Sequence, residues 1–219
     1  MLEIKKGLTM LQIKASLLMI AAAFSTQLLS AKNLDRPTGF DPKLFSFALV
    51  ESALERLSHK VTYDGSYRKI AFPWGDVPDN IGVCTDVVIR SYRKLGIDLQ
   101  ERVHADISNN FQAYPNLAKW DRKKADTNID HRRVLNLRVF FERYGQSLPI
   151  TDTANNYRPG DLVTWNIMPG MPHIGIVTNQ ITRDKKRPLI VHNIGKGPKL
   201  EDVLFTMDIT GHYRYQPRY

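Results

Sequence analysis

The 219-residue chain has a single cysteine, Cys84. One cysteine excludes an intramolecular disulfide and any zinc or iron–sulfur site that is built from several thiolates. The sequence also lacks internal repeats and any block of five or more like charges, the pattern typical of nucleic-acid-binding arms. With 42% hydrophobic and 24% charged residues, it has the composition of one ordinary globular domain. We therefore expect no nucleic-acid partner and no cofactor.

No hydrophobic run is long enough to cross a bilayer comfortably. The longest, residues 15–29, falls short of the ~20 apolar residues that a spanning helix needs. It follows three lysines and ends at a small residue, which is the pattern of a secretory signal peptide over residues 1–31. This predicts a periplasmic protein with no membrane span after cleavage. An uncleaved membrane anchor is the alternative, and Met10 is an alternative start that would give a shorter signal.

Acidic residues are fewer than basic ones, 22 against 31, which gives a formal charge of +9. Residues 1–31 hold three lysines and one glutamate, so the chain without them carries +7. This modest positive charge favours an anionic partner.

Three helices are expected in the first two thirds of the chain. Residues 32–40 are predicted to be a linker, and Asp41-Pro42 is then a helix start. The apolar face of this first helix is expected to consist of Leu44, Phe47, Val50, Leu54 and Leu57. The second helix is predicted over residues 82–95, with Gly96 after its end, and the third over residues 131–144, with the stripe Val134, Leu137, Phe141 and Tyr144. Residues 67–72 are expected to form a strand, and residues 98–130 to be irregular.

Alternation of apolar residues replaces helical periodicity after residue 145. Residues 161–166, 173–178 and 188–193 are predicted to be three successive strands, with further strands over residues 202–213. Residues 183–187, the densest run of charges, are expected to be a solvated turn. Helices followed by an antiparallel sheet predict an α+β fold, in one domain over residues 41–219.

Cys84 is the first candidate for chemistry. It is expected in the first turn of the second helix, where free backbone N–H groups and the helix dipole favour a thiolate. A lone cysteine is more often a small buried hydrophobic residue. In an exported protein, however, an unpaired thiol invites oxidation, and its neighbours Gly-Val-Cys-Thr-Asp are not those of a core strand. We therefore interpret Cys84 as a nucleophile.

Two histidines on neighbouring predicted strands complete the candidate site. His173 opens one strand, and its imidazole can exchange a proton near neutral pH. His192 lies near the end of the next strand and is followed by Asn193. Successive side chains of a strand point to opposite faces, so only one of these two can face His173. A cysteine with two such histidines matches the nucleophile–base–orienter arrangement of cysteine hydrolases.

Four segments in this order resemble the NlpC-type branch of papain-like cell-wall hydrolases. They are the helix start at Cys84, Tyr157-Arg-Pro-Gly-Asp-Leu-Val163, His173-Ile-Gly-Ile-Val177 and Ile190-Val-His192. The resemblance covers roughly residues 78–215. It implies an NlpC-type fold with the site Cys84, His173 and His192, and peptidoglycan or its muropeptides as partner. Three further segments, residues 82–88, 126–132 and 211–215, resemble a group of exported bacterial proteins catalogued as a domain of unknown function and placed in the same superfamily.

The chain departs from the family pattern next to the cysteine, where Asp86 replaces a glycine. The candidate substrate-binding residues are Asp86 and, from the segment 126–132, Asp130, His131 and Arg132, together with Asp126 and Asn128. The alternative is that Asp130 caps the third helix while Arg132 and Arg133 lie in solvent. Arg90, Arg132 and Lys196 are candidate partners for substrate carboxylates.

The expected function is a periplasmic cysteine peptidase or amidase that cleaves amide bonds in peptidoglycan stem peptides. Cys84 would attack as a thiolate, His173 would carry the proton, His192 would orient the ring, and N–H groups at the helix start would hold the oxyanion. Three rival hypotheses remain: a metal hydrolase using His131, His173, His192 and an aspartate, a non-catalytic wall-binding module with the same fold, and an antibacterial wall-degrading toxin.

Overall fold

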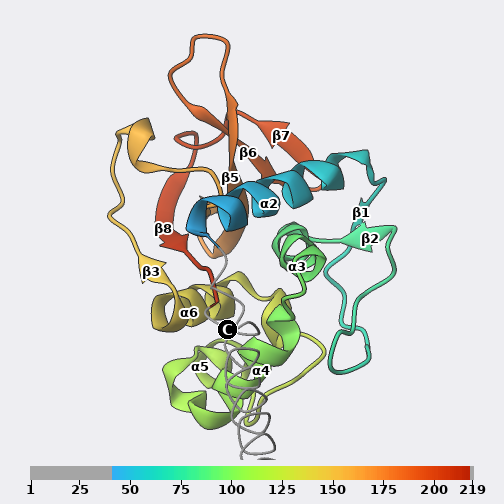
Figure 1. The fold of residues 1–219 in the computed structure, drawn as a ribbon. Coiled ribbons are helices and arrows are strands. Elements are labelled where there is room, and N and C mark those ends of the chain that lie inside the picture. The colour runs from blue at the N-terminus through green and yellow to red at the C-terminus, as the bar shows by residue number, and fades with distance from the viewer. Residues whose placement is uncertain (1–40, 218–219) are drawn as a thin grey trace, which may run out of the picture. The chain divides into compact units, whose positions relative to one another are not determined.

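We describe a computed structural model of the chain over residues 41–217 (Figure 1). The predicted signal peptide and linker lie outside these residues. The helices are α2 (Pro42–Glu55), α3 (Cys84–Lys94), α4 (Leu99–Asn109), α5 (Asn116–Trp120) and α6 (Val134–Tyr144), with short 3-10 turns η1 (Arg56–Ser58), η2 (Phe111–Ala113), η3 (Asp130–Arg132) and η4 (Ala154–Asn156). The strands are β1 (Thr62–Tyr63), β2 (Ile81–Gly82), β3 (Gln146–Ser147), β4 (Leu162–Met168), β5 (Met171–Ile181), β6 (Pro188–His192), β7 (Lys199–Glu201) and β8 (Asp208–Arg214). Within the described residues, none of the helices is both long and apolar enough to span a membrane.

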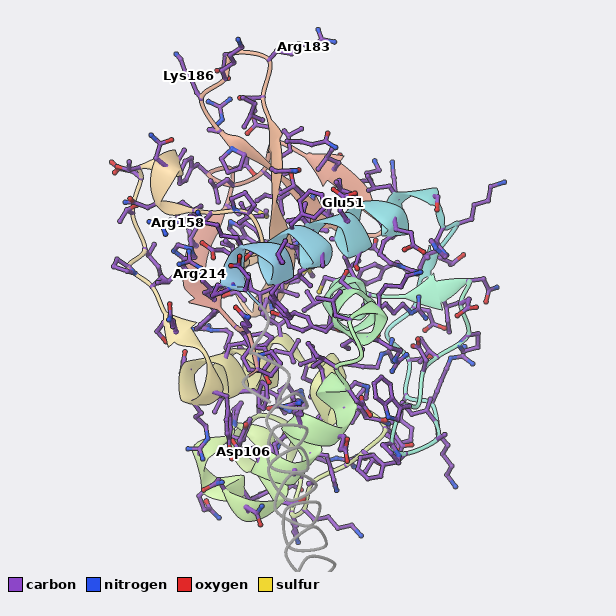
Figure 2. All side chains as sticks on the ribbon, in the orientation of Figure 1. Glu51, Asp106, Arg158, Arg183, Lys186 and Arg214 are labelled. Carbon is purple, nitrogen blue, oxygen red and sulfur yellow. The ribbon has the colours of Figure 1, made fainter. Side chains whose placement is uncertain are left out.

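A six-stranded sheet forms the second half of the molecule. Its strands follow the order β3-β8-β4-β5-β6-β7, and all neighbours are antiparallel. Strands β4, β5 and β6 confirm the three predicted strands, and β8 confirms a further one in the C-terminal segment. The helices precede this sheet in the chain, so the predicted α+β class is confirmed (Figure 1). The hairpin tip between β5 and β6 is exposed, and Figure 2 shows Arg183 and Lys186 there, pointing away from the sheet.

The two faces of the sheet pack against different layers. Leu162, Ile174 and Ile176 face the helices, where they join the larger core formed by α2, α3, α4 and α6. The alternate residues Val163 and Trp165 face a smaller cluster that includes Tyr157 and Leu204. This period of two confirms which residues of each strand share a face. It also decides on which face each candidate histidine lies.

The first helix is present as predicted, but its buried face is different. Asp41 caps α2 by accepting a hydrogen bond from the Lys43 N–H at 2.9 Å. The helix buries Phe45, Leu49, Val50, Ser52 and Ala53, whereas Leu44 and Phe47 are 61% and 57% exposed. Two overlapping sets of apolar residues in this segment have helical spacing, and both sets include Val50. The small side chains of Ser52 and Ala53 permit close packing, and the helix face that contains them faces the core.

The expectations for residues 67–72 and 98–130 were wrong. Residues 67–72 lack a strand partner and bind side chains instead, as when Ile70 N–H donates to Asn128 Oδ1 at 2.9 Å. Residues 98–130 contain α4 and α5. Asp98 caps α4 through the Gln100 N–H at 2.9 Å, and Leu99, Val103 and Ile107 form its buried stripe. A capping residue followed by apolar residues every four positions was therefore a readable helix signal.

The other two helices agree with prediction within a turn. α3 buries Val87 and Val88, and Gly96 follows its end with a φ of 75°, a conformation that glycine adopts without strain. α6 begins at Val134 rather than at residue 131, because residues 130–132 form the separate turn η3. Its stripe is buried except for Tyr144, which is 52% exposed.

Candidate functional site

Cys84 is the first residue of α3 and is 4% exposed. The preceding Val83 is extended, with a φ of −120°, and its N–H donates to Asp86 Oδ2 at 2.6 Å. The carboxylate of Asp86 thus closes the first turn from within the helix. Cys84 is held at a helix start by its own neighbours, as the sequence predicted.

Asp86 and Arg132 form a buried ion pair beneath this helix start. Arg132 donates from Nε and from one terminal nitrogen to the two carboxylate oxygens, both at 2.9 Å, and the side chains are 2% and 3% exposed. Arg132 also reaches the carbonyls of Asp64 and Ser66, while its own carbonyl accepts from the Thr85 hydroxyl at 3.0 Å. Both residues are fully occupied with each other. Their charges face each other rather than solvent and fix the Cys84 helix, so the structure gives no support to substrate binding by either residue.

The sulfur of Cys84 has three donors around it. The backbone N–H groups of Ile174 and Thr85 and the hydroxyl of Tyr63 lie near it. Burial nevertheless dominates and raises the pKa of the thiol to about 11. This does not support the predicted resting thiolate, since the cost of desolvating a charge outweighs the helix start and the nearby donors. Partial burial and the adjacent sulfur raise the pKa of Tyr63 to about 12, although this residue is 43% exposed.

Cys84 lies near the β5 residue that follows His173. Strand β6 pairs with β5 only as far as Gly175, opposite His192, so the Ile174 N–H lies beyond the last paired residue of β6. The Cys84 side chain lies near this N–H and shares the helical core with Ile174. His173, one residue before Ile174, points to the other face against Trp165, with ring centroids 5.9 Å apart. Cys84 and the His173 ring thus approach successive residues of β5 from different faces.

His173 contacts His192, as predicted. His173 Nε2 lies 3.1 Å from His192 Nδ1, and the two rings meet edge to face with centroids 5.1 Å apart. Both side chains are almost fully buried. Burial lowers the pKa of His173 to about 3, and it also lowers the pKa of His192. Both rings are therefore neutral at neutral pH.

Asn193 points to the opposite face from His192. It lies near Val83 and Val87 at the start of α3, fully buried, and neither polar atom of its side chain has a partner among the described residues. The alternation of the strand thus selects His192 over Asn193 as the partner of His173. His192 Nε2 in turn lies 3.1 Å from Glu201 Oε2 on β7.

The remaining residues of the 126–132 segment do not face the cysteine. Asp130 is buried and accepts from the Asp126 N–H at 2.6 Å and from Arg133 at 3.2 Å. Arg133 occupies the N-cap position of α6, without a side-chain capping bond, so the alternative that Asp130 caps this helix is wrong. His131 is 2% exposed, and burial with the nearby Arg132 charge lowers its pKa to about 3. These residues shape the turn rather than bind a ligand.

Asp126 and Asn128 do border a cavity, of about 570 Å³, that residues 121–128 form with Tyr67. Asn128 donates to the Tyr67 hydroxyl at 3.0 Å. Lys123 and Lys124 lie exposed at its edge. Tyr67 follows Tyr63 by four residues, so at most about 14 Å of extended chain separates the cavity from the Cys84 site.

Of the three candidate partners for substrate carboxylates, only Lys196 is exposed. Arg90 is 8% exposed and binds Asp76 at 3.0 and 3.2 Å and the carbonyls of Val77 and Pro78. Like Arg132, it is a structural arginine.

Two motifs of the resemblance form one buried network at the other end of the sheet. Asp161 accepts from Arg214 at 2.7 and 2.9 Å and contacts His212 Nε2 at 2.8 Å. Asp161 lies by Val177, four residues along β5 from His173. The network joins the turn before β4 to β8, and it lies away from Cys84.

The sequence interpretation missed two residues of the site. Tyr63 approaches Cys84 from β1, 21 positions earlier in the chain, and Glu201 approaches His192 from β7. Neither stands in a recognisable motif. The metal hydrolase hypothesis loses its geometric basis, because no three potential metal ligands gather anywhere in residues 41–217, and the largest charge effects on His131 come from Arg132 and Arg93.

Comparison with known proteins places the chain among bacterial relatives. The uncharacterized protein YijF of Escherichia coli (strain K12) is 44% identical over 170 residues, which are 78% of this chain and 82% of that protein. No solved structure matches the chain. The family described as "Domain of unknown function (DUF1287)" matches residues 50–215, and the chain belongs to this family.

Proposed function

We propose that this protein is a periplasmic cysteine hydrolase of the NlpC type, which cleaves amide bonds in peptidoglycan stem peptides. The observation that carries the proposal is the position of the only thiol. Cys84 begins a helix and lies near Ile174, the residue after His173 on β5, and His192 contacts His173 at 3.1 Å. The proposal assigns these three residues, which come from three elements, as nucleophile, base and orienter.

The arrangement of elements supports the NlpC-type assignment. The cysteine helix packs on β5, and the two histidines lie on the neighbouring strands β5 and β6. This order of helix, strand and strand is the order of the motifs that resemble the family. The positive charge of the chain fits an anionic wall polymer.

The resting site holds a neutral thiol and a neutral imidazole. When a substrate carbonyl approaches, the Cys84 proton passes to His173 as sulfur attacks the carbonyl carbon. His173 Nδ1 is the nitrogen for this role, because Nε2 is engaged by His192. The carbonyl electrons move onto oxygen, which gives a tetrahedral oxyanion.

Two donors at the helix start are placed for this oxyanion. The Cys84 N–H and the Tyr63 hydroxyl both lie close to the sulfur. A substrate oxygen that enters there can accept from the Cys84 N–H, and the phenol can donate to it as well. Collapse expels the amine, which takes the proton from His173. Water, deprotonated by His173, then hydrolyses the thioester and frees Cys84.

Digestion of purified sacculi tests the proposal. The chain without residues 1–31 should release new muropeptides, identified by mass spectrometry, and Cys84→Ala should release none while keeping its circular dichroism spectrum. Tyr63→Phe should lower the rate by about 10-fold or more through loss of one oxyanion donor. Equal products from wild type and Cys84→Ala would sink the mechanism.

One observation favours a second candidate, a wall-binding module without turnover. Cys84 is 4% exposed and its pKa is raised, as expected for a cysteine that serves only as a core residue. In that case calorimetry would detect muropeptide binding of equal strength in wild type and Cys84→Ala, with no product formed by either.

A further inference from the structure

We propose that Glu201 is a positioning residue, which sets the tautomers of His192 and His173 and so leaves His173 Nδ1 unprotonated, the state that a base requires. The role assigned to His173 rests on the proposed function. The tautomers themselves do not, and they can be measured without any substrate.

The chain of contacts begins at the Glu201 carboxylate. Glu201 Oε2 lies 3.1 Å from His192 Nε2, and Glu201 Oε1 lies 3.7 Å from the Lys199 ammonium. Within the described residues, no partner of His192 Nε2 meets strict hydrogen-bond geometry. The Glu201 oxygen at 3.1 Å is the acceptor within its reach. An ionised carboxylate only accepts hydrogen bonds.

The proton positions of both rings then follow. If His192 carried its proton on Nδ1, the lone pair of Nε2 would face an anionic oxygen at 3.1 Å, which is repulsive. The favoured tautomer has the proton on Nε2 and the lone pair on Nδ1. Since this lone pair faces His173 Nε2 at 3.1 Å, His173 must donate from Nε2. A neutral imidazole has only one N–H, so His173 Nδ1 is a free base.

Burial makes this control necessary. The groups around His192 are His173 from β5, and Glu201 and Lys199 from β7. Water is excluded from the two rings, so it cannot compensate for a wrong tautomer. Glu201 itself is 41% exposed, which makes it a replaceable residue whose loss should leave the fold intact.

Nitrogen NMR of the imidazoles is the direct test. In the Cys84→Ala chain, two-bond ¹H–¹⁵N correlations should show both His173 and His192 protonated on Nε2 at pH 7, with signals assigned by His173→Gln and His192→Gln. Glu201→Ala should shift His192 toward the Nδ1 tautomer. Glu201→Gln should preserve the wild-type pattern because its amide oxygen still accepts. Asp202→Ala, which removes the neighbouring carboxylate of similar exposure that binds Arg187, is the matched control and should leave both tautomers unchanged.

Activity then separates this inference from the proposed function. With Cys84 present, Glu201→Ala should lower kcat/KM by about 10-fold to 100-fold, mostly in kcat, and Glu201→Gln should recover most of it. Protons on Nδ1 in either ring, or tautomers unchanged by Glu201→Ala, would overturn the inference even in an active hydrolase. The stated tautomers in a chain that hydrolyses nothing would leave the inference standing and refute the proposed function.

Discussion

The buried ion pair under the cysteine helix gives the sharpest prediction about stability. Asp86→Asn keeps the shape of the side chain but removes the charge that faces Arg132, whose side chain is 2% exposed. Breaking one partner of a buried pair costs about 3–5 kcal/mol, because the other charge stays desolvated. The amide oxygen can still accept one hydrogen bond, so we expect about 3 kcal/mol. For a domain of this size, the melting temperature should fall by roughly 6–12 °C.

A second arginine–aspartate pair serves as the matched control. Arg187 binds both oxygens of Asp202 at 2.7–3.2 Å, but those side chains are 32% and 39% exposed. Asp202→Asn should therefore cost less than about 1 kcal/mol. The two pairs share the same chemistry and differ in burial, so the contrast isolates desolvation.

Urea denaturation of the two variants measures both free energies of unfolding. The double variant Asp86→Asn/Arg132→Met should lose less than the sum of the single changes, because no charge is then left buried alone. It should not recover fully, since the carbonyls of Asp64 and Ser66 lose a donor. A cost below about 1 kcal/mol for Asp86→Asn, equal to that of Asp202→Asn, would refute the reasoning from burial.

Three further predictions concern reactivity, pH and binding. Alkylation of Cys84 by iodoacetamide should keep rising from pH 7 to 10, because burial raises its pKa to about 11; a plateau near pH 7 would reveal a thiolate. Folded His131 has a pKa of about 3 and stays neutral, whereas in the unfolded chain it binds a proton below about pH 6.5. Its contribution to the free energy of unfolding is therefore complete above that pH and falls by about 1.4 kcal/mol per pH unit on acidification. Urea titrations should show a shallower fall for His131→Gln, and parallel curves would contradict this. Lys124→Ala, at the cavity edge, should raise KM for acidic muropeptides, whereas Lys186→Ala on the distant hairpin should not.

The fold class followed from the sequence because periodicity is a local property. Strands β4, β5 and β6 are short runs rich in Val, Ile and Leu, and a glycine follows the end of both α3 and α6, so both kinds of element could be identified without any partner. The buried face of α2, in contrast, could not be predicted from the sequence. Two sets of apolar residues have helical spacing along α2, and the packing of Ser52 and Ala53 against the core decides which set is buried.

The roles of the charged residues also depended on distant partners. Substrate binding was expected of Asp86, Arg132 and Arg90 because they lie near the cysteine in the sequence or in the motifs. Each proved to be paired within the fold, over separations of 14 to 46 positions. Sequence spacing carries no information on such pairs, because burial and complementary charge are set only when the elements pack.

The sequence by itself determined the α+β class, the place of Cys84 at a helix start and the restriction that only one of His192 and Asn193 can face His173. Those features depend on residue type and on the period of a helix or strand. Only the tertiary structure decided that His192 is the partner of His173, that burial raises the pKa of the thiol, and that Tyr63 and Glu201 lie at the candidate site. The reason is physical: solvent exclusion and contacts between elements far apart in the chain set pKa values and hydrogen-bond partners, and neither exists before the chain has folded.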